Sequence, residues 1–116
     1  MISSDVSKAR FRVFLATAKD MDEAKIIANA LVNDRLAACV NILPNITSVY
    51  RWNNEVKTDD EVLMVIKSRE SLREELTTKI KNLHSYETPE VISLPIFGGS
   101  NSYIKWLGES LEDEKL

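Results

Sequence analysis

The sequence is poor in the residues that mark several common kinds of functional site. Its 116 residues include one cysteine, Cys39, and one histidine, His84. A lone cysteine cannot form a disulfide within the chain, and it excludes a zinc site built from several cysteines. The sequence also has no nucleophile elbow, phosphate-binding loop, zinc-protease motif or dinucleotide-binding fingerprint. We therefore expect a protein that is not an enzyme.

Long hydrophobic runs and an excess of positive charge are missing as well. The most apolar stretch, residues 62–66, has the length of a strand and falls far short of the roughly 18 residues that a membrane helix needs. A formal net charge of -3 provides no basic surface for nucleic acid. Residues 1–12 are polar and contain no apolar segment of a secretory signal. We expect a cytoplasmic protein that binds neither nucleic acid nor a membrane.

The sequence does contain enough apolar residues for one globular domain. A chain of 116 residues, 44% of them hydrophobic, is near the commonest domain size and too short for two domains. We expect one domain over residues 1–116, with a core over about residues 11–111, a polar N-terminal tail and an acidic C-terminal tail from Glu109 to Leu116. A large surplus of apolar surface on so small a domain would need cover from a partner subunit.

The first part of the chain predicts a strand followed by a helix. Apolar residues alternate over residues 11–17, as in a strand that is buried mainly on one face. Asp20 can cap a helix, and Glu23 follows it three residues later, as in a capping box. Apolar residues then recur at helical spacing until the pair at 33–34, and this pattern places Glu23 on the outer, polar face.

The middle of the chain predicts a long hairpin. Residues 37–52 are rich in β-branched and aromatic residues, and Pro44 implies a bulge because it cannot donate a ladder hydrogen bond. Residues 53–54 are asparagines, which suit a tight turn before a second strand over residues 55–67. Both strands are roughly twice the common length, so the hairpin should project beyond its own core. Its exposed edge near Trp52 would favour aggregation unless other subunits paired with it.

The last part predicts a helix, a strand and a short helix. The first of these helices opens near Ser68, and its packing face carries Leu72, Leu76, Ile80 and Leu83. A strand over residues 91–94 is closed by Pro95, and the final helix begins near Asn101. The resulting β-α-β-β-α-β order predicts an α+β, ferredoxin-like split βαβ sandwich with both main helices on one face of an antiparallel sheet.

Several blocks of this sequence, in order and spacing, resemble the CutA family of divalent-cation tolerance proteins. The blocks are residues 36–41 with Pro44, residues 50–52, residues 61–68, residues 84–90 and residues 103–107. The resemblance covers about Phe11 to Leu111. It implies a homotrimer of ferredoxin-like subunits whose hairpins pair between subunits, an architecture similar to that of PII signalling proteins. It also implies a role in tolerance of metal ions, copper especially.

The resemblance further implies where a metal ion would bind. Similar enterobacterial proteins are credited with copper ligands at a cysteine in the first strand and at two adjacent histidines. Ala16 and Leu83 stand at two of these positions, so His84 is the one match. We expect weak binding of a divalent metal ion, most of all copper, with His84 and Cys39 as candidate ligands. Both residues also have structural explanations, which we favour: His84 as a helix C-terminal residue and Cys39 as a packed core residue.

A second kind of site follows from the same blocks. A polar and aromatic cleft between subunits could bind a small anionic ligand, and its lining would be Glu61, Lys67, Tyr103 and Trp106. The explanation we favour for Tyr103 and Trp106 is that they form the packing face of the last helix. Three functions stay open: a metal-binding tolerance protein, a PII-like small-ligand sensor or partner scaffold, and, in distant third place, an enzyme that depends on the Cys39 thiol.

Overall fold

The helices and strands follow one another along the chain in the predicted order. The computed structural model describes residues 10–112, and the expected N-terminal tail and residues 113–116 of the expected acidic tail lie outside this range. The elements are β1 (Phe11–Ala18), α1 (Met21–Asn33), β2 (Cys39–Trp52), β3 (Glu55–Arg69), the 3₁₀ helix η2 (Glu70–Leu72), α2 (Arg73–Leu83), β4 (Val91–Ile96) and α3 (Asn101–Ser110).

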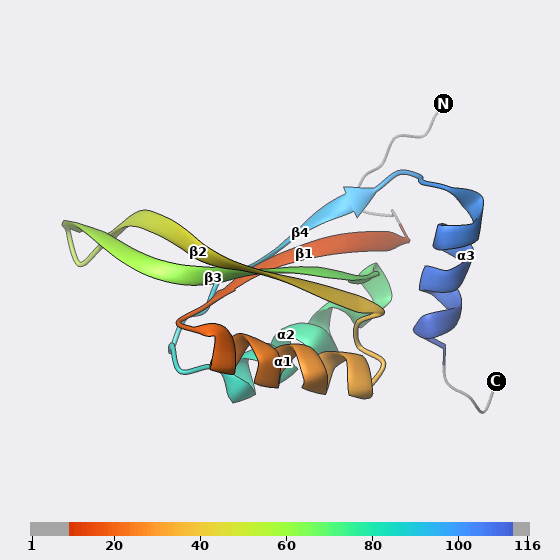
Figure 1. Ribbon diagram of the computed structural model, residues 1–116, viewed down its shortest axis with the longest axis horizontal. Helices are drawn as coiled ribbons and strands as arrows, with labels where there is room; N and C mark the ends of the chain where they lie inside the picture. Colours follow the sequence, from red (N-terminus) through yellow and green to blue (C-terminus); the bar gives the residue numbers. More distant parts are fainter. Residues whose placement is uncertain (1–9, 113–116) are drawn as a thin grey trace.

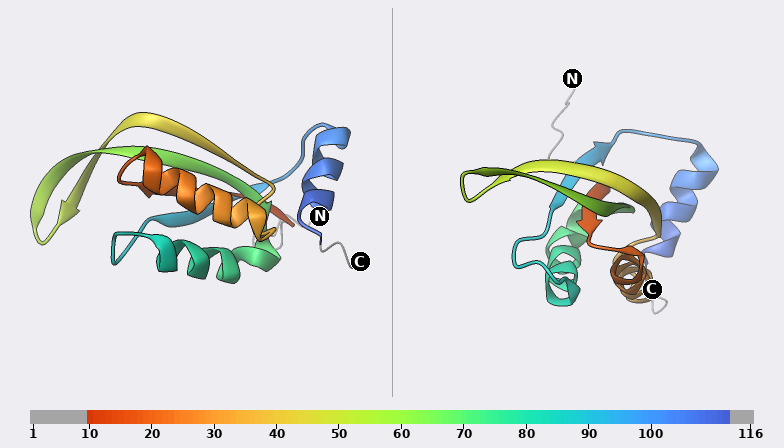
Figure 2. Two further views of the ribbon diagram at one scale, coloured as in Figure 1. Left: turned by 60° about the horizontal axis from the view of Figure 1, so that its bottom comes forward. Right: turned by 60° about the vertical axis from the view of Figure 1, so that its left-hand side comes forward.

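The four strands form one antiparallel sheet in the order β2-β3-β1-β4. Helices α1 and α2 lie side by side against one face of this sheet, and α3 lies at the end of the sheet away from the hairpin turn (Figure 1). The β2–β3 hairpin continues well beyond the two helices (Figure 2). This arrangement confirms the predicted ferredoxin-like α+β fold.

The sheet face toward α1 and α2 carries the hydrophobic core. Alternate residues of β1 and β3 point to this face, and Phe14, Met64 and Ile66 are completely buried there. The helices cover them with Ile27, Leu31, Leu76 and Ile80. Burying each of these side chains contributes about 1.5–3 kcal/mol, so this face holds the fold together.

The opposite face of the sheet, which we call the open face, has no helix over it within residues 10–112 except at the end where α3 packs against Phe11 (Figure 2). The register places Leu15 between Val65 and Ile92, and directly opposed residues share a face. Ile92 and Leu94 are 53% and 50% exposed, and Leu43 on the far strand is 43% exposed. The chain therefore leaves a contiguous apolar sheet surface uncovered.

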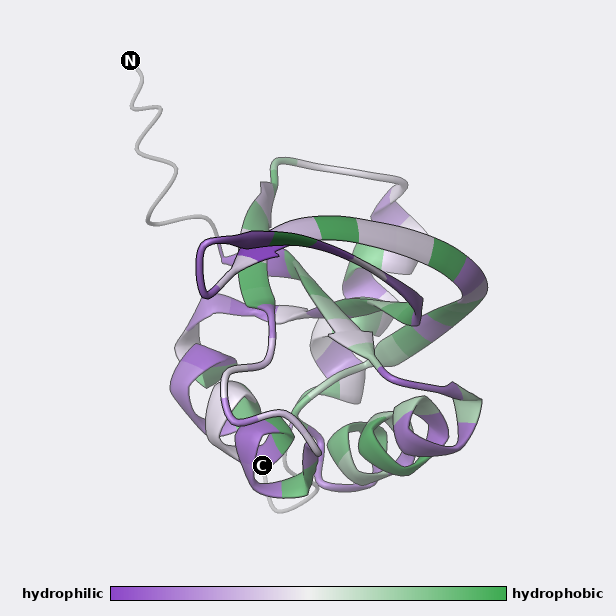
Figure 3. Cartoon of the chain, turned by 90° about the vertical axis from the view of Figure 1, so that its left-hand side faces the viewer, coloured by the Kyte–Doolittle hydropathy of each residue, from purple (hydrophilic) through white to green (hydrophobic). Residues whose placement is uncertain are grey.

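The hairpin forms as the sequence predicts. The β2–β3 register shifts between Leu43 and Ile46, around Pro44, and Asn45 there has φ 63°. The turn residues Asn53 and Asn54 have φ 51° and 64°, the left-handed region that asparagine tolerates. Around the turn the chain is mostly hydrophilic (Figure 3), so the tip of the hairpin suits contact with water.

Helix α3 packs on the end of the sheet through a small separate cluster. Leu107 and Leu111 are buried there against Phe11 and Ala38. Gly108 permits this close approach, because a Cβ atom at that position would lie 3.3 Å from the Phe11 ring. The expectation that an acidic tail starts at Glu109 is therefore wrong, since the helix needs Leu111 for packing.

Three other boundaries or faces differ from the prediction. Strand β4 runs through Pro95 to Ile96, which an edge strand permits because its outer side has no ladder partner in the sheet. Ser68 does not start a helix: it lies in β3, is fully buried, and donates a hydrogen bond to the Leu36 carbonyl at 2.6 Å. Leu83 is 38% exposed at the end of α2, so it is not part of that helix's packing face.

No helix in the described part of the chain is long and apolar enough to cross a membrane.

Candidate functional site

His84 begins the loop that follows α2, and its side chain is completely buried. Its Nε2 atom lies 2.7 Å from the carbonyl oxygen of Thr17, and its Nδ1 atom accepts a hydrogen bond from the backbone N–H of Tyr86 at 3.0 Å. A carbonyl can only accept, so Nε2 carries the proton and the imidazole is neutral. Both ring nitrogens are thus engaged with the backbone, and a metal ion would have to displace one of these bonds.

Glu23 supports the same loop from α1. One carboxylate oxygen accepts a hydrogen bond from the Lys19 amide at 3.0 Å, and the other accepts one from the Ser85 amide at 2.8 Å. Burial raises the pKa of Glu23, but the hydrogen bonds from Lys19 and Ser85 lower it by more, so the net shift is downward. A charged Glu23 therefore ties the start of α1 to the loop.

The prediction that Glu23 lies on the outer face of its helix is wrong, because the residue is 8% exposed. The helical pattern alone could not reveal this, since the partner amide comes from a loop 62 positions further along the chain.

The expected cap at the start of α1 is confirmed in part. Asp20 accepts a hydrogen bond from the Glu23 amide at 2.9 Å, but Glu23 reaches back to Lys19 rather than to the cap residue itself.

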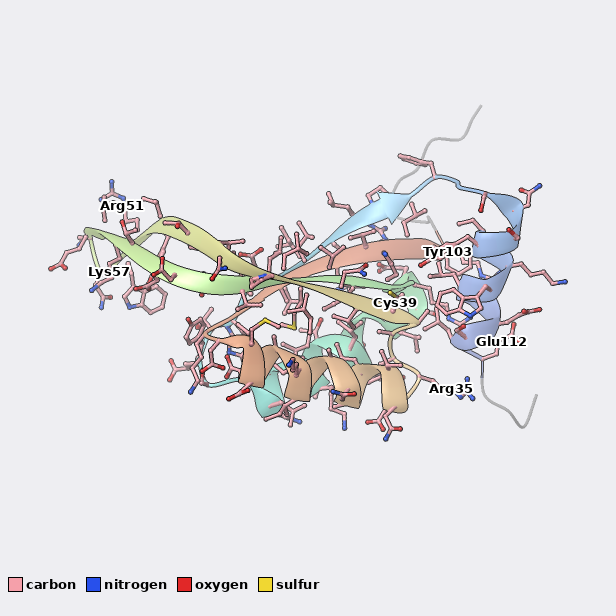
Figure 4. The ribbon with its side chains drawn as sticks, viewed as in Figure 1. Arg35, Cys39, Arg51, Lys57, Tyr103 and Glu112 are labelled. Atoms are coloured by element: carbon pink, nitrogen blue, oxygen red, sulfur yellow. The ribbon has the colours of Figure 1, made fainter. Side chains whose placement is uncertain are left out.

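Cys39 lies far from His84 within one subunit. It pairs with Lys67, which in turn pairs with Val13, whereas His84 contacts Thr17. Val13 and Thr17 are four positions apart on β1, about 13 Å at the usual rise per residue. Cys39 sits at the α3 end of the sheet, away from the hairpin tip (Figure 4). One chain therefore does not bring the two candidate ligands to one ion.

The favoured explanation that Cys39 packs in the core is wrong. The residue is half-buried, and its sulfur lies 3.8 Å from the Asn41 side-chain oxygen, a weak hydrogen bond on the surface. Within residues 10–112, no three histidine, cysteine, aspartate or glutamate side chains gather closely enough to hold a metal ion. The side chains that the structure describes in one subunit thus do not make a multidentate site.

The expected cleft for an anionic ligand is not assembled within one subunit either. Lys67 and Glu61 are six positions apart on β3, roughly 20 Å at the usual rise per residue. Tyr103 and Trp106 lie on α3, at the far end of the sheet from the hairpin. They are each 43% exposed, with ring centroids 5.3 Å apart, so the interpretation of this pair as the helix packing face is wrong.

A different cavity lies between the outer part of the hairpin and the loop after His84. Its volume is about 610 Å³. Its lining combines three aromatic residues, four carboxylates and four smaller side chains: Tyr50, Trp52, Tyr86, Asp59, Glu61, Glu87, Glu90, Thr17, Ser48, Val49 and Thr88. We call this cavity the acidic cleft.

Among the four carboxylates that line the acidic cleft, Glu61 is the most deeply buried, at 9% exposed. One of its oxygens accepts a hydrogen bond from the Tyr86 hydroxyl at 2.9 Å, and Tyr50 donates a hydrogen bond to Asp59 nearby. Burial and the Glu61 carboxylate raise the pKa of Tyr86. Burial, and then the charge of Glu61, also raise the pKa of Glu90. Negative charge is therefore concentrated and incompletely balanced here.

The acidic cleft was not predicted from the sequence. The alternation of Tyr50 and Trp52, and of Asp59 and Glu61, could have placed these residues on one face of the hairpin, since the register pairs Ser48 with Asp59 and Tyr50 with Lys57. The position of residues 84–90 against that face depends on the path of a loop, which residue patterns do not fix.

Comparison with known proteins identifies the family. The family described as CutA1 divalent ion tolerance protein matches residues 12–110. The chain belongs to this family. It is 48% identical over 98 residues to the protein CutA, chloroplastic, of Arabidopsis thaliana, covering 84% of this chain and 54% of the relative. It is 45% identical over 98 residues to the divalent-cation tolerance protein CutA of Thermus thermophilus, covering 84% and 95%.

Solved structures of CutA proteins share the fold. The divalent cation tolerance protein of Thermus thermophilus gives a TM-score of 0.85 at 44% identity, covering 86% of this chain and 97% of that one. CutA1 of Oryza sativa gives 0.87 at 42% identity, covering 93% and 99%. The chain spans little more than half the length of the first plant relatives and nearly all of the Thermus protein. The family description names divalent-ion tolerance and no catalysed reaction.

Proposed function

We propose that this CutA-family chain acts in divalent-cation tolerance as a non-catalytic homotrimer that binds divalent metal ions, copper above all, weakly. The family match supports the tolerance role. The open face of the sheet supports assembly, and the engaged nitrogens of His84 support weak rather than tight metal binding. A cytoplasmic location stays a prediction, because two of the relatives are described as chloroplastic.

The exposed apolar face of the sheet is the main observation that supports assembly. Ile92, Leu94 and Leu43 expose about half of their surface on one side of a sheet that is tightly covered on the other. A contiguous apolar surface of this kind marks an interface. The neighbouring edge strand β2 also carries Trp52, 51% exposed, and an unpaired edge invites pairing with another chain. A closed ring of three subunits, as the family resemblance implies, would cover both features.

Metal binding through His84 is expected to be weak for a local reason. A copper ion needs a nitrogen lone pair, and in the neutral ring the lone pair lies on Nδ1, which is used by the Tyr86 amide. Freeing it gives up a hydrogen bond worth about 0.5–1.5 kcal/mol and leaves the amide to find another partner. Cys39 would have to come from another subunit to join the same ion, since it is distant within one chain.

The assembly is tested by light scattering after size-exclusion chromatography in metal-free buffer. We expect three times the chain mass for the wild type. Leu94→Asp places a charge on the open face and should yield smaller species, because an unpaired buried charge is strongly destabilising. Thr78→Asp adds the same charge at an exposed position on α2 and should stay trimeric. A monomeric wild type, or a trimeric Leu94→Asp variant, contradicts the proposal.

The metal role is tested by calorimetric titration with Cu(II). We expect saturable, weak binding that is reduced in His84→Ala, with Cys39→Ser measured as a separate variant to isolate the thiol. Each variant is first checked for its assembly state and melting temperature, so that loss of the loop is not mistaken for loss of a ligand. An unchanged titration in both variants would exclude His84 and Cys39 as ligands.

A further inference from the structure

We propose that the open face docks head to tail on a second copy of this chain, so that the basic side chains at one end of the face meet the acidic cleft of the next subunit. This docking rests on the homotrimer proposed above, and it specifies which parts of two neighbouring subunits meet. The observations behind it are charges of opposite sign at the two ends of one sheet face, the lack of partners for those charges within residues 10–112, and the apolar surface between them.

Strand β3 carries these opposite charges on the open face. The register sets Val65 opposite Leu15 on that face, and successive side chains of a strand alternate between the two faces. Lys67 and Arg69 therefore share the open face with Val65, on the side toward α3. Glu61 shares it as well, closer to the hairpin turn. Lys67 and Glu61 are six positions apart, roughly 20 Å at the usual rise per residue, so they do not pair within one chain.

The acidic end of the face has no cation of its own. Four carboxylates line the acidic cleft, and none of its lining residues is basic. No lysine or arginine among residues 10–112 forms an ion pair with any of the four. The hydrogen bond from Tyr86 to Glu61 comes from a neutral group and leaves the charge unbalanced. Burial, and then the charge of Glu61, raise the pKa of Glu90, as expected where negative charge lacks a counter-charge.

The basic end of the face has no carboxylate of its own. The ammonium group of Lys67 donates to the side-chain oxygen of Asn41 at 2.5 Å, which is a neutral acceptor. The Nε atom of Arg69 is buried and has no hydrogen-bonding partner among the described residues. Neither side chain forms an ion pair within residues 10–112. Two positive charges at this end thus match the unbalanced carboxylates at the other.

The apolar surface between the two ends decides how the copies align. A second copy that covers Leu15, Ile92 and Leu94 also removes water from the charges on either side of them, and charges removed from water are ordinarily paired. Setting the basic end of one copy against the acidic cleft of the next pairs both sets of charges, whereas acid against acid is unfavourable. In a ring of three, each subunit offers its basic end to one neighbour and its acidic cleft to the other, so the three contacts are equivalent.

The aromatic wall of the acidic cleft suits the same partner. Tyr50 and Trp52 are 38% and 51% exposed beside the carboxylates. A lysine or arginine side chain buries its methylene groups against aromatic rings and is attracted to the ring faces by cation–π interaction. A basic side chain from a neighbouring subunit would therefore cover the aromatic wall and neutralise the carboxylates together.

The test exchanges the charges of the two ends and measures the mass of the assembly by light scattering over a range of protein concentrations. Lys67→Glu and Glu61→Lys each place like charges at every contact, and each should raise the concentration needed for half-assembly by about tenfold or more. The double variant restores opposite charges across each contact and should recover most of the trimer. Because the two positions lie roughly 20 Å apart in one chain, this recovery can come only from contact between copies. The matched controls Lys81→Glu and Glu75→Lys reverse exposed charges on α2 and should assemble as the wild type does.

A mixture of the two single variants distinguishes a ring of three from a two-fold pair. Lys67→Glu chains are acidic at both ends, and Glu61→Lys chains are basic at both ends. One chain of each kind would make a fully matched pair, whereas a ring of three must keep one contact between two like chains. We therefore expect less trimer from the mixture than from the double variant.

A second reversal keeps the result decisive if Glu61→Lys folds poorly. Glu90→Lys changes an exposed residue of the cleft, and it should weaken assembly alone and recover it together with Lys67→Glu. A trimeric wild type whose two double variants both fail to recover, or whose α2 controls act as strongly as the cleft variants, overturns the docking and leaves the trimer standing. Recovery in the mixture as full as in the double variant also overturns it. A monomeric wild type overturns the trimer and the docking together.

Discussion

The two faces of the sheet differ in how completely other elements of the same chain cover them. On the helix side, Phe14, Met64 and Ile66 are fully buried by α1 and α2. On the open face, Leu15 and Val65 of the same two strands are only half-buried, and Ile92 and Leu94 of β4 are 53% and 50% exposed. Adjacent residues of one strand thus meet opposite environments, although both sets are apolar.

The residues of the covered face stabilise the subunit itself, whereas the residues of the open face are exposed for contact with other molecules. The covered face is satisfied within residues 10–112, so its residues contribute to stability directly. The open face, with the hairpin edge and the acidic cleft beside it, stays partly uncovered within residues 10–112. Assembly is for that reason expected on this side of the sheet, and the comparison can be tested with matched substitutions on the two faces.

The largest effect should come from a truncation on the covered face. Phe14→Ala leaves a cavity between the sheet and both helices, and we expect it to lower the free energy of unfolding by about 3–5 kcal/mol at every protein concentration. Leu94→Ala, on the open face, should act through assembly instead, so its cost should depend on protein concentration. Urea unfolding at several concentrations measures both. Equal, concentration-independent losses for the two variants would contradict the division between the faces.

Much of the fold could be predicted from the sequence because residues close together in the chain determine it. The turn at Asn53 and Asn54 and the bulge at Pro44 each follow from the backbone preference of one or two residues, and the structure confirms both. Boundaries were less predictable where tertiary contacts decide them. Ser68 resembles a helix cap in sequence but is held in β3 by its hydrogen bond to Leu36.

The functional residues were less predictable, because their roles depend on partners distant in sequence. Glu23 has the position of an outer helical residue, yet Ser85 draws it into the protein. His84 was a candidate metal ligand by type, while its two nitrogens are bonded to backbone groups of Thr17 and Tyr86. Residue type predicts which chemistry is available, whereas the fold decides which lone pair or proton is free to perform it.

A smaller effect is expected from the carboxylate that fixes the loop beside the acidic cleft. Glu23→Gln replaces a charged acceptor of two backbone amides with an amide that can accept at one oxygen, and we expect a loss of about 1–3 kcal/mol in unfolding free energy. Because the folded pKa of Glu23 is lowered, its contribution is present above the unfolded value, 4.5, and is lost as the pH falls through the folded value.

Unfolding measured between pH 7 and pH 3 should therefore show a stability difference between wild type and Glu23→Gln that shrinks toward acid. Glu75→Gln, at an exposed position on α2, serves as the control and should run parallel to the wild type. A difference that stays constant with pH would mean that the carboxylate charge of Glu23 does not hold the loop.

The smallest effect concerns the caps of two helices that lie in different surroundings. Asp20 accepts the Glu23 amide at 2.9 Å at the start of α1, and Ser100 accepts the Tyr103 amide at 3.3 Å at the start of α3. Asp20→Ala should cost about 1 kcal/mol of unfolding free energy, and Ser100→Ala should cost less, because its bond is longer and α3 packs only on the small cluster around Phe11. Asp20→Asn keeps the side-chain acceptor and should recover most of the loss. Urea midpoints of the three variants rank these stability costs. A larger cost for Ser100→Ala than for Asp20→Ala would mean that the cap of α3 contributes more to the stability of the subunit than the cap of α1 on the covered face.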